Sequence, residues 1–419
     1  MRTWYDLLQQ EKSWIRYCWP LSLLILAVVS ILIAAPYLKV WHHFQAGQAA
    51  LERYHAEEAL VHFNACLQVC PEDCRVRLLA SRAAWRAGHF EEASRHLESC
   101  QNHLGLCEEI LLEWALQRAA AGDLTPAEKY LQARLKRQDF LPQGPLICEA
   151  LVLGYLHTYR FRDARNCLNY WLEQQPDNVQ ALFLRAAVYL ARKQLQKAAD
   201  DYRRVLQLDP QRREARMALI SCLLDVEVEV RAYSEALPLL QEMLHQQPDD
   251  ANAQVMLALC REGLAQPQEA AAILDRVLQE HPDHGLALRE RGQLALQEGQ
   301  ATEAEHWIRQ SLAVMPQDLV AHNCLLRCLQ QQGKTTEAQL QRERIEQLQK
   351  WYKRLREITE QISQRPYDPA LYCEIGILNV RLGRPDLGYR WLLYARSLDA
   401  NYQPAQAALA EYFGAELQP

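Results

Sequence analysis

Alanine recurs along this chain at a nearly constant interval, and that interval constrains the fold more than any other feature. The alanines that set the period, the marker alanines, are Ala59, Ala93, Ala127, Ala164, Ala198, Ala236, Ala270, Ala304 and Ala338. Six of the eight intervals between them are 34 residues long. A fixed period of this length is typical of a repeat protein, in which each repeat is one supersecondary unit that stacks on its neighbours.

Other residue types recur in phase with the marker alanines. A bulky residue follows four positions later, and small residues such as Gly47 and Gly292 precede several of them by twelve. In six units a proline follows twelve positions later: Pro71, Pro176, Pro210, Pro248, Pro282 and Pro316. The pattern predicts two antiparallel helices per unit, with small residues where the helices cross and a proline that ends the second helix.

Glycine recurs at the expected turn between the two helices of a unit. These glycines are Gly88, Gly122, Gly299 and Gly333. A helix often ends in a residue with positive φ, which glycine adopts without strain. We therefore expect positive φ at this position.

The combined pattern resembles the tetratricopeptide repeat family. The clearest unit is Val179–Arg212, with Leu182, Ala186, Tyr189 and Ala198 on the family's pattern. The resemblance implies an all-α fold, a right-handed α-solenoid of helix–turn–helix repeats over residues 40–335. It also implies that the first helix of each repeat, helix A, lines a concave face that binds other proteins or peptides.

The pattern changes after the last marker alanine. Residues 336–365 form a charged stretch with apolar residues at nearly heptad spacing, which predicts one long helix. The stretch fits a helix packed on the last repeats better than a coiled-coil dimer, because it is short. Residues 366–400 resemble a further repeat that is out of phase, and residues 401–419 a capping helix and tail.

An apolar segment near the N-terminus predicts a membrane anchor. Residues 21–35 carry no charge, and the extended span 17–38 is long enough to cross a bilayer. Trp14, Trp19 and Trp41 flank it, as at membrane interfaces. A cleaved signal peptide is the alternative, although Pro36 disfavours cleavage there. The basic residues of the tail, residues 1–16, favour repeats on the extracytoplasmic side of a single-pass protein, such as one of a bacterial inner membrane.

No motif in the sequence carries recognisable catalytic chemistry. The 13 cysteines form no Cys-x-x-Cys pair, and Gly333-Lys334-Thr335 lacks the first glycine of a phosphate-binding loop, since Cys328 stands there. His42, His43, His55 and His62 have no spacing that fixes a metal geometry. We therefore predict no catalytic residue, cofactor or metal, and a net charge of -6 argues against nucleic-acid binding.

The candidate partner-binding residues are those expected on the concave face. They are Arg75, Arg82, Trp85, Arg86, Arg289, Gln293, Asn323 and Arg327. Arginines beside a tryptophan suit an acidic or extended peptide. The alternative is ordinary solvated surface. The Lys/Asn/Asn set with which some family members clamp a peptide C-terminus does not occur at the matching positions.

The sequence thus predicts a non-enzymatic, membrane-anchored scaffold or adaptor. Resemblance alone suggests a role in envelope assembly, secretion or polysaccharide export. The alternative is a regulatory or accessory subunit that presents a substrate to a separate enzyme. The sequence does not identify the partner or the oligomeric state.

Overall fold

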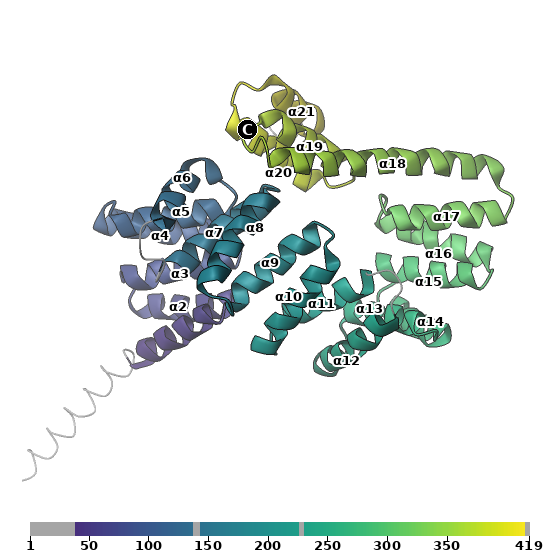
Figure 1. Cartoon of the computed structure of the whole chain (residues 1–419), viewed down its shortest axis with the longest axis horizontal. Coiled ribbons are helices and arrows are strands. Elements are labelled where there is room, and N and C mark those ends of the chain that lie inside the picture. Colours follow the sequence, from purple (N-terminus) through teal and green to yellow (C-terminus); the bar gives the residue numbers. More distant parts are fainter. Residues whose placement is uncertain (1–37, 137–142, 226–229, 415–419) are drawn as a thin grey trace, which may run out of the picture. The chain divides into compact units, whose positions relative to one another are not determined.

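Helices are the only regular elements in the part of the chain that the computed structural model describes, residues 38–136, 143–225 and 230–414 (Figure 1). The chain divides into two compact units, Met1–Gly154 and Tyr155–Pro419. Each helix packs mainly on the next one along the chain, as in a repeat array. This arrangement is an all-α helical-repeat solenoid.

The first unit begins, in its described part, with a helix over residues 38–52. The following helices are α2 (Ala56–Val69), α3 (Cys74–Arg86), α4 (Phe90–Leu104), α5 (Glu108–Ala120), α6 (Leu124–Leu135) and α7 (Gly144–His157), which runs into the second unit.

The second unit continues the array. Its helices are α8 (Phe161–Gln174), α9 (Val179–Ala191), α10 (Leu195–Leu208), α11 (Arg213–Asp225), α12 (Val230–Gln246), α13 (Ala251–Gly263), α14 (Pro267–Glu280), α15 (Gly285–Gln297), α16 (Ala301–Val314), α17 (Leu319–Gln331), α18 (Thr335–Ile362), α19 (Pro369–Arg381), α20 (Pro385–Leu398) and α21 (Gln403–Phe413).

The marker alanines lie on the second helix of each repeat, helix B, and all nine are buried. The small residues of helix A are needed at the crossing. A Cβ atom on Gly47 would lie 2.8 Å from the Phe63 ring, and one on Gly292 would lie 2.7 Å from Cδ1 of Ile308. The predicted close approach of the two helices is therefore confirmed at these positions.

The turn between helix A and helix B has positive φ five residues before the marker alanine. The prediction is confirmed at the four expected glycines, where φ lies between 73° and 93°. Four other repeats place a side chain at the same position, at Tyr54, Tyr159, Lys193 and Ala265, with φ between 56° and 61°. The fold therefore imposes this conformation even where the sequence does not supply glycine.

A polar residue caps helix A two positions after most of the recurring prolines. Backbone N–H groups of the first turn donate to the side chains of Asp73, Asn178, Asp250, His284 and Asp318. Asp368 accepts in the same way two positions after Pro366, outside the period. These caps satisfy donors that an α-helix leaves unpaired at its start. The motif Pro-x-Asp/Asn/His therefore marks the start of helix A in these repeats.

The long helix α18 packs on α17 and α19 within the chain. Its buried apolar residues include Ile345, Leu348, Ile358 and Ile362. Ile358 and Ile362 belong to a buried cluster with apolar residues of α19, α20 and α21.

Contacts also join the start and the end of the second unit. The Tyr159 ring, in the turn before α8, stacks on Trp391 of α20 with ring centroids 4.8 Å apart. Nη1 of Arg160 donates to the Tyr367 hydroxyl at 3.3 Å. The turn before α8 thus packs against the helices that follow α18.

The predicted anchor over residues 17–38 lies outside the described residues, except for residue 38. The N-terminal tail, residues 1–16, and the last five residues of the chain also lie outside them. Among the described residues, no helix is long and apolar enough to cross a membrane.

Candidate partner-binding surfaces

Arginines of α3 link that helix to acidic residues of other helices in the first unit. Nε of Arg82 donates to Oε1 of Glu113 on α5 at 2.7 Å. Nε of Arg86 donates to Oε2 of Glu149 on α7 at 3.0 Å. Trp85, between them, is 1% exposed. Three predicted partner-binding residues therefore make contacts within the unit.

Glu113 is fully buried, and its surroundings explain why Arg82 must face it. Burial raises the pKa of Glu113, and the charge and hydrogen bonds of Arg82 oppose the rise. Burial would lower the pKa of Arg82, but the attraction of Glu113 raises it. Oε2 of Glu113 is buried and accepts no hydrogen bond, so the pair is only partly satisfied.

A second set of predicted residues lies on α15 and α17, which contact each other. Nη1 of Arg289 donates to Oδ2 of Asp318 at 2.9 Å, and its Nε donates to Oε1 of Glu290 at 2.8 Å. Gln293 is half-buried, whereas Asn323 and Arg327 are exposed. The structure brings these four residues onto neighbouring A helices.

The eight predicted residues thus fall into two groups. Arg82, Arg86 and Arg289 form ion pairs, and Trp85 is buried. The remaining four are exposed or half-buried and make no ion pair within the described residues: Arg75, Gln293, Asn323 and Arg327. Partner binding by any of the eight stays a prediction.

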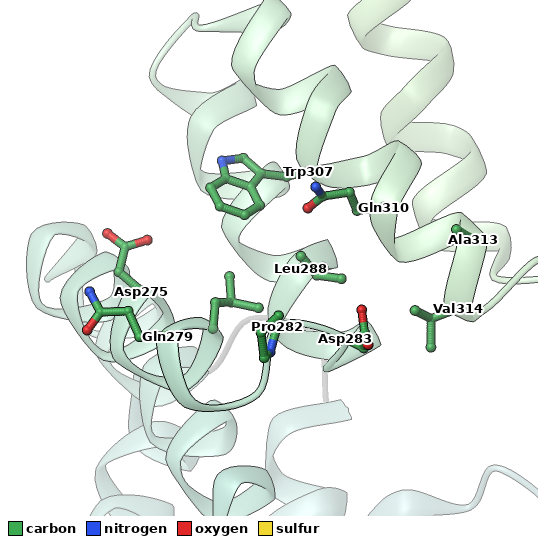
Figure 2. Close-up of a pocket in the computed structure, with 10 residues that line it drawn as sticks. Asp275, Gln279, Pro282, Asp283, Leu288, Trp307, Gln310, Ala313 and Val314 are labelled. Carbon is green, nitrogen blue, oxygen red and sulfur yellow. The ribbon is translucent and has the colours of Figure 1, made fainter.

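A pocket of about 570 Å³ lies among α14, α15 and α16 of the second unit (Figure 2). Leu288 and Trp307 give it apolar walls, and Asp283 contributes a carboxylate, whereas Asp275 is already paired with Arg291 at 2.8 Å. Such a lining suits an apolar side chain that has a cation beside it. The helix A positions of the repeat pattern did not predict this pocket, because residues of α14 and α16, both B helices, form most of its lining. The sequence feature that could have predicted it is Trp307, a large aromatic residue on helix B at a position where the repeat pattern requires no bulky residue.

The rejected phosphate and metal motifs occupy ordinary structural positions. Gly333 lies in a turn, and Nζ of Lys334 forms an ion pair with Oε2 of Glu305 at 2.7 Å. Nδ1 of His43 and Nδ1 of His62 are 3.0 Å apart. In the part of the chain that the structure describes, no group of three His, Cys, Asp or Glu side chains is arranged to hold a metal ion.

Comparison with known families identifies the repeats. Tetratricopeptide repeat models match residues 150–213 and residues 228–294. No curated protein matches the chain in sequence. The two matched stretches are tetratricopeptide repeats, and proteins built from such repeats are typically non-enzymatic scaffolds for protein–protein interaction.

Several solved structures match parts of the chain at low identity. Residues 41 to the end of MamA from Desulfovibrio magneticus RS-1 are 17% identical, with a TM-score of 0.36 over 41% of this chain and 95% of that one. A tetratricopeptide repeat protein from Parabacteroides merdae is 14% identical, with a TM-score of 0.34 over 70% of this chain and 99% of that one. YrrB, described as having an unusual peptide-binding site, is 14% identical, with a TM-score of 0.28 over 57% of this chain and 96% of that one.

Proposed function

We propose that this protein is a membrane-anchored scaffold that binds partner proteins through the A helices of its second unit. The span over residues 17–38 would hold it in a bacterial inner membrane, with a right-handed repeat array on the extracytoplasmic side. Its partners would act in envelope assembly, secretion or polysaccharide export. The observation that carries the proposal is the surface of α15 and α17, where Gln293, Asn323 and Arg327 lie on consecutive A helices in contact.

The chemistry of this surface suits an extended peptide. Arg289 is neutralised by Glu290 and Asp318, which fixes its position beside the amide of Gln293 on the next helical turn. Amide and guanidinium groups on adjacent helices offer donors and acceptors to a peptide backbone, and Arg327 offers a charge to a carboxylate.

Capture of partners from cells tests the proposal. The full chain would be cross-linked in its membrane and purified, in parallel with the variant Asn323→Ala/Arg327→Ala. The matched control is Gln268→Ala/Arg276→Ala, which removes an amide and a guanidinium from exposed positions on α14. We expect a stoichiometric partner with the wild type and the control, and at least tenfold less with the first variant. Equal capture by all three would contradict the proposal.

The identity of the captured protein separates the proposal from its alternative. A stoichiometric enzyme would favour an accessory subunit that presents a substrate. A set of structural envelope proteins would favour the scaffold.

Protease treatment of intact spheroplasts tests the orientation. We expect digestion of the repeats without lysis, because the basic tail favours a cytoplasmic N-terminus. Protection until lysis would place the repeats in the cytoplasm.

A further inference from the structure

Three arginines without an acidic partner meet at one pocket of the second unit. Arg162 and Arg165 lie on α8, Arg192 directly follows α9, and all three are exposed. They line a pocket of about 400 Å³ together with Tyr189 and Gln194. We name this the arginine pocket. Within the described residues, none of the three side chains makes a hydrogen bond or ion pair.

Other arginines near the pocket do form ion pairs. Arg160 pairs with Asp163 at 2.7 Å, and Arg185 pairs with Asp201 at 2.7 Å. Asp163 and Asp201 are therefore already engaged by other arginines. Three like charges remain together, and their mutual repulsion favours a bound counter-ion.

The net charge of the lining defines the charge of the ligand. Glu360 of α18 is the one carboxylate among the lining residues, so three arginines and one glutamate leave a net charge of +2 (3 − 1 = 2). A phosphate monoester carries about −1.5 to −2 at neutral pH and presents three acceptor oxygens. A single carboxylate carries −1 and two oxygens, so it would leave a cation unmatched.

The positions of the lining residues also favour an anion. Arg162 lies in the first turn of α8 and Gln194 immediately precedes α10, and neither helix start has a side-chain cap. The N-terminus of a helix carries a partial positive charge and unpaired N–H groups. Arginine is also suited to bidentate contacts with phosphate oxygens.

We propose that the arginine pocket binds a phosphate monoester, held by Arg162, Arg165 and Arg192. The phosphate belongs either to a phosphorylated side chain of a partner or to a free phosphate compound. This site is separate from the α15 and α17 surface and stands whether or not that surface binds a protein.

A binding titration with the full chain in detergent tests the proposal. The probe is a labelled alanine peptide with one phosphoserine, compared with the same peptide carrying serine or aspartate. We expect the phosphorylated peptide to bind at least tenfold more tightly than either. The variant Arg162→Gln/Arg165→Gln/Arg192→Gln should weaken binding at least tenfold.

A matched control separates the pocket from general charge effects. The variant Arg276→Gln/Arg342→Gln/Arg396→Gln removes three exposed arginines of the same unit that also make no side-chain bond within the described residues. It has the same net charge as the first variant and should bind like the wild type. Equal loss in both variants, or no loss in the first, would overturn the proposal.

Two further measurements sharpen the result. Glu360→Gln should tighten binding three- to tenfold, since it removes the negative charge from the lining, and an unchanged affinity would count against the pocket. Inorganic phosphate should displace the peptide. An affinity for phosphate close to that of the peptide would indicate a free phosphate compound as the ligand, and a much weaker one would indicate a phosphorylated partner.

Discussion

At the scale of single residues, positive φ in the turn between helices is a property of the repeat rather than of glycine. Tyr54, Tyr159, Lys193 and Ala265 adopt it with a Cβ atom present. The left-handed region costs a residue other than glycine about 1–2 kcal/mol. The packing of helix A on helix B must supply this free energy.

Ala265→Gly should therefore stabilise the second unit by about 0.5–1 kcal/mol, because glycine removes the strain at φ 59°. Chemical denaturation measures the change. Ala272→Gly, at an exposed position inside α14, is the control and should destabilise by about 1 kcal/mol. A loss of stability in both variants would show that the turn stores no strain.

The ion pair between Arg82 and Glu113 is a second feature at this scale. Arg82→Ala leaves the fully buried Glu113 without its partner, so we expect a loss of about 3 kcal/mol in the free energy of unfolding. The double variant Arg82→Met/Glu113→Leu should recover most of it, since apolar residues of similar size need no partner. A double variant as unstable as the single one would argue against this explanation.

At the scale of elements, the crossing of α15 and α16 depends on Gly292. A Cβ at this position would lie 2.7 Å from Cδ1 of Ile308. Gly292→Leu should therefore cost about 2–3 kcal/mol through overpacking. The cost should be smaller in a protein that already carries Ile308→Ala, because the space is then available, and a double-mutant cycle measures the difference.

Glu305 of α16 accepts hydrogen bonds from Arg309 of the same helix and from Gln332 and Lys334 in the turn between α17 and α18. These bonds make the free energy of unfolding depend on pH. Burial alone would raise the pKa of Glu305, but hydrogen bonds from Lys334, Arg309 and Gln332 lower it from 4.5 to about 2. Glu305 therefore binds a proton less tightly in the folded state than in the unfolded state. The stabilisation is complete above pH 4.5 and is lost as the pH falls towards 2.

We expect Glu305→Gln to cost about 1–2 kcal/mol at pH 7, allowing for screening by solvent. Denaturation of the wild type and the variant between pH 7 and pH 2 measures it, and the difference should shrink below pH 4.5. A constant difference would mean that the carboxylate charge does not contribute.

At the scale of the whole molecule, the second unit departs from a linear array, in which each repeat contacts only its neighbours. Tyr159 stacks on Trp391, and the Tyr372 hydroxyl lies 3.5 Å from the Thr158 carbonyl oxygen, to which it donates. Residues more than 200 positions apart thus stabilise each other, and unfolding of this unit should be more cooperative than that of an open array.

Trp391→Ala should therefore increase hydrogen exchange in α8, although the two lie at opposite ends of the unit in sequence. Trp307→Ala, in the middle of the unit, is the control and should leave exchange in α8 unchanged. If exchange rose only in α19, α20 and α21, the contact between the two ends would contribute no stability.

The repeat could be predicted from the sequence alone, because packing two helices at close distance requires small and bulky residues at fixed positions. Ala304, Gly292 and Ile308 carry that requirement locally, and the turn glycines were predictable for the same reason. Which surface arginines form ion pairs could be seen only in the tertiary structure. Arg82 and Arg289 form ion pairs with acids from other helices, whereas Arg162, Arg165 and Arg192 form none within the described residues, although Glu360 lines the same pocket. Ion pairing depends on which side chains distant segments bring together, and no local pattern encodes that.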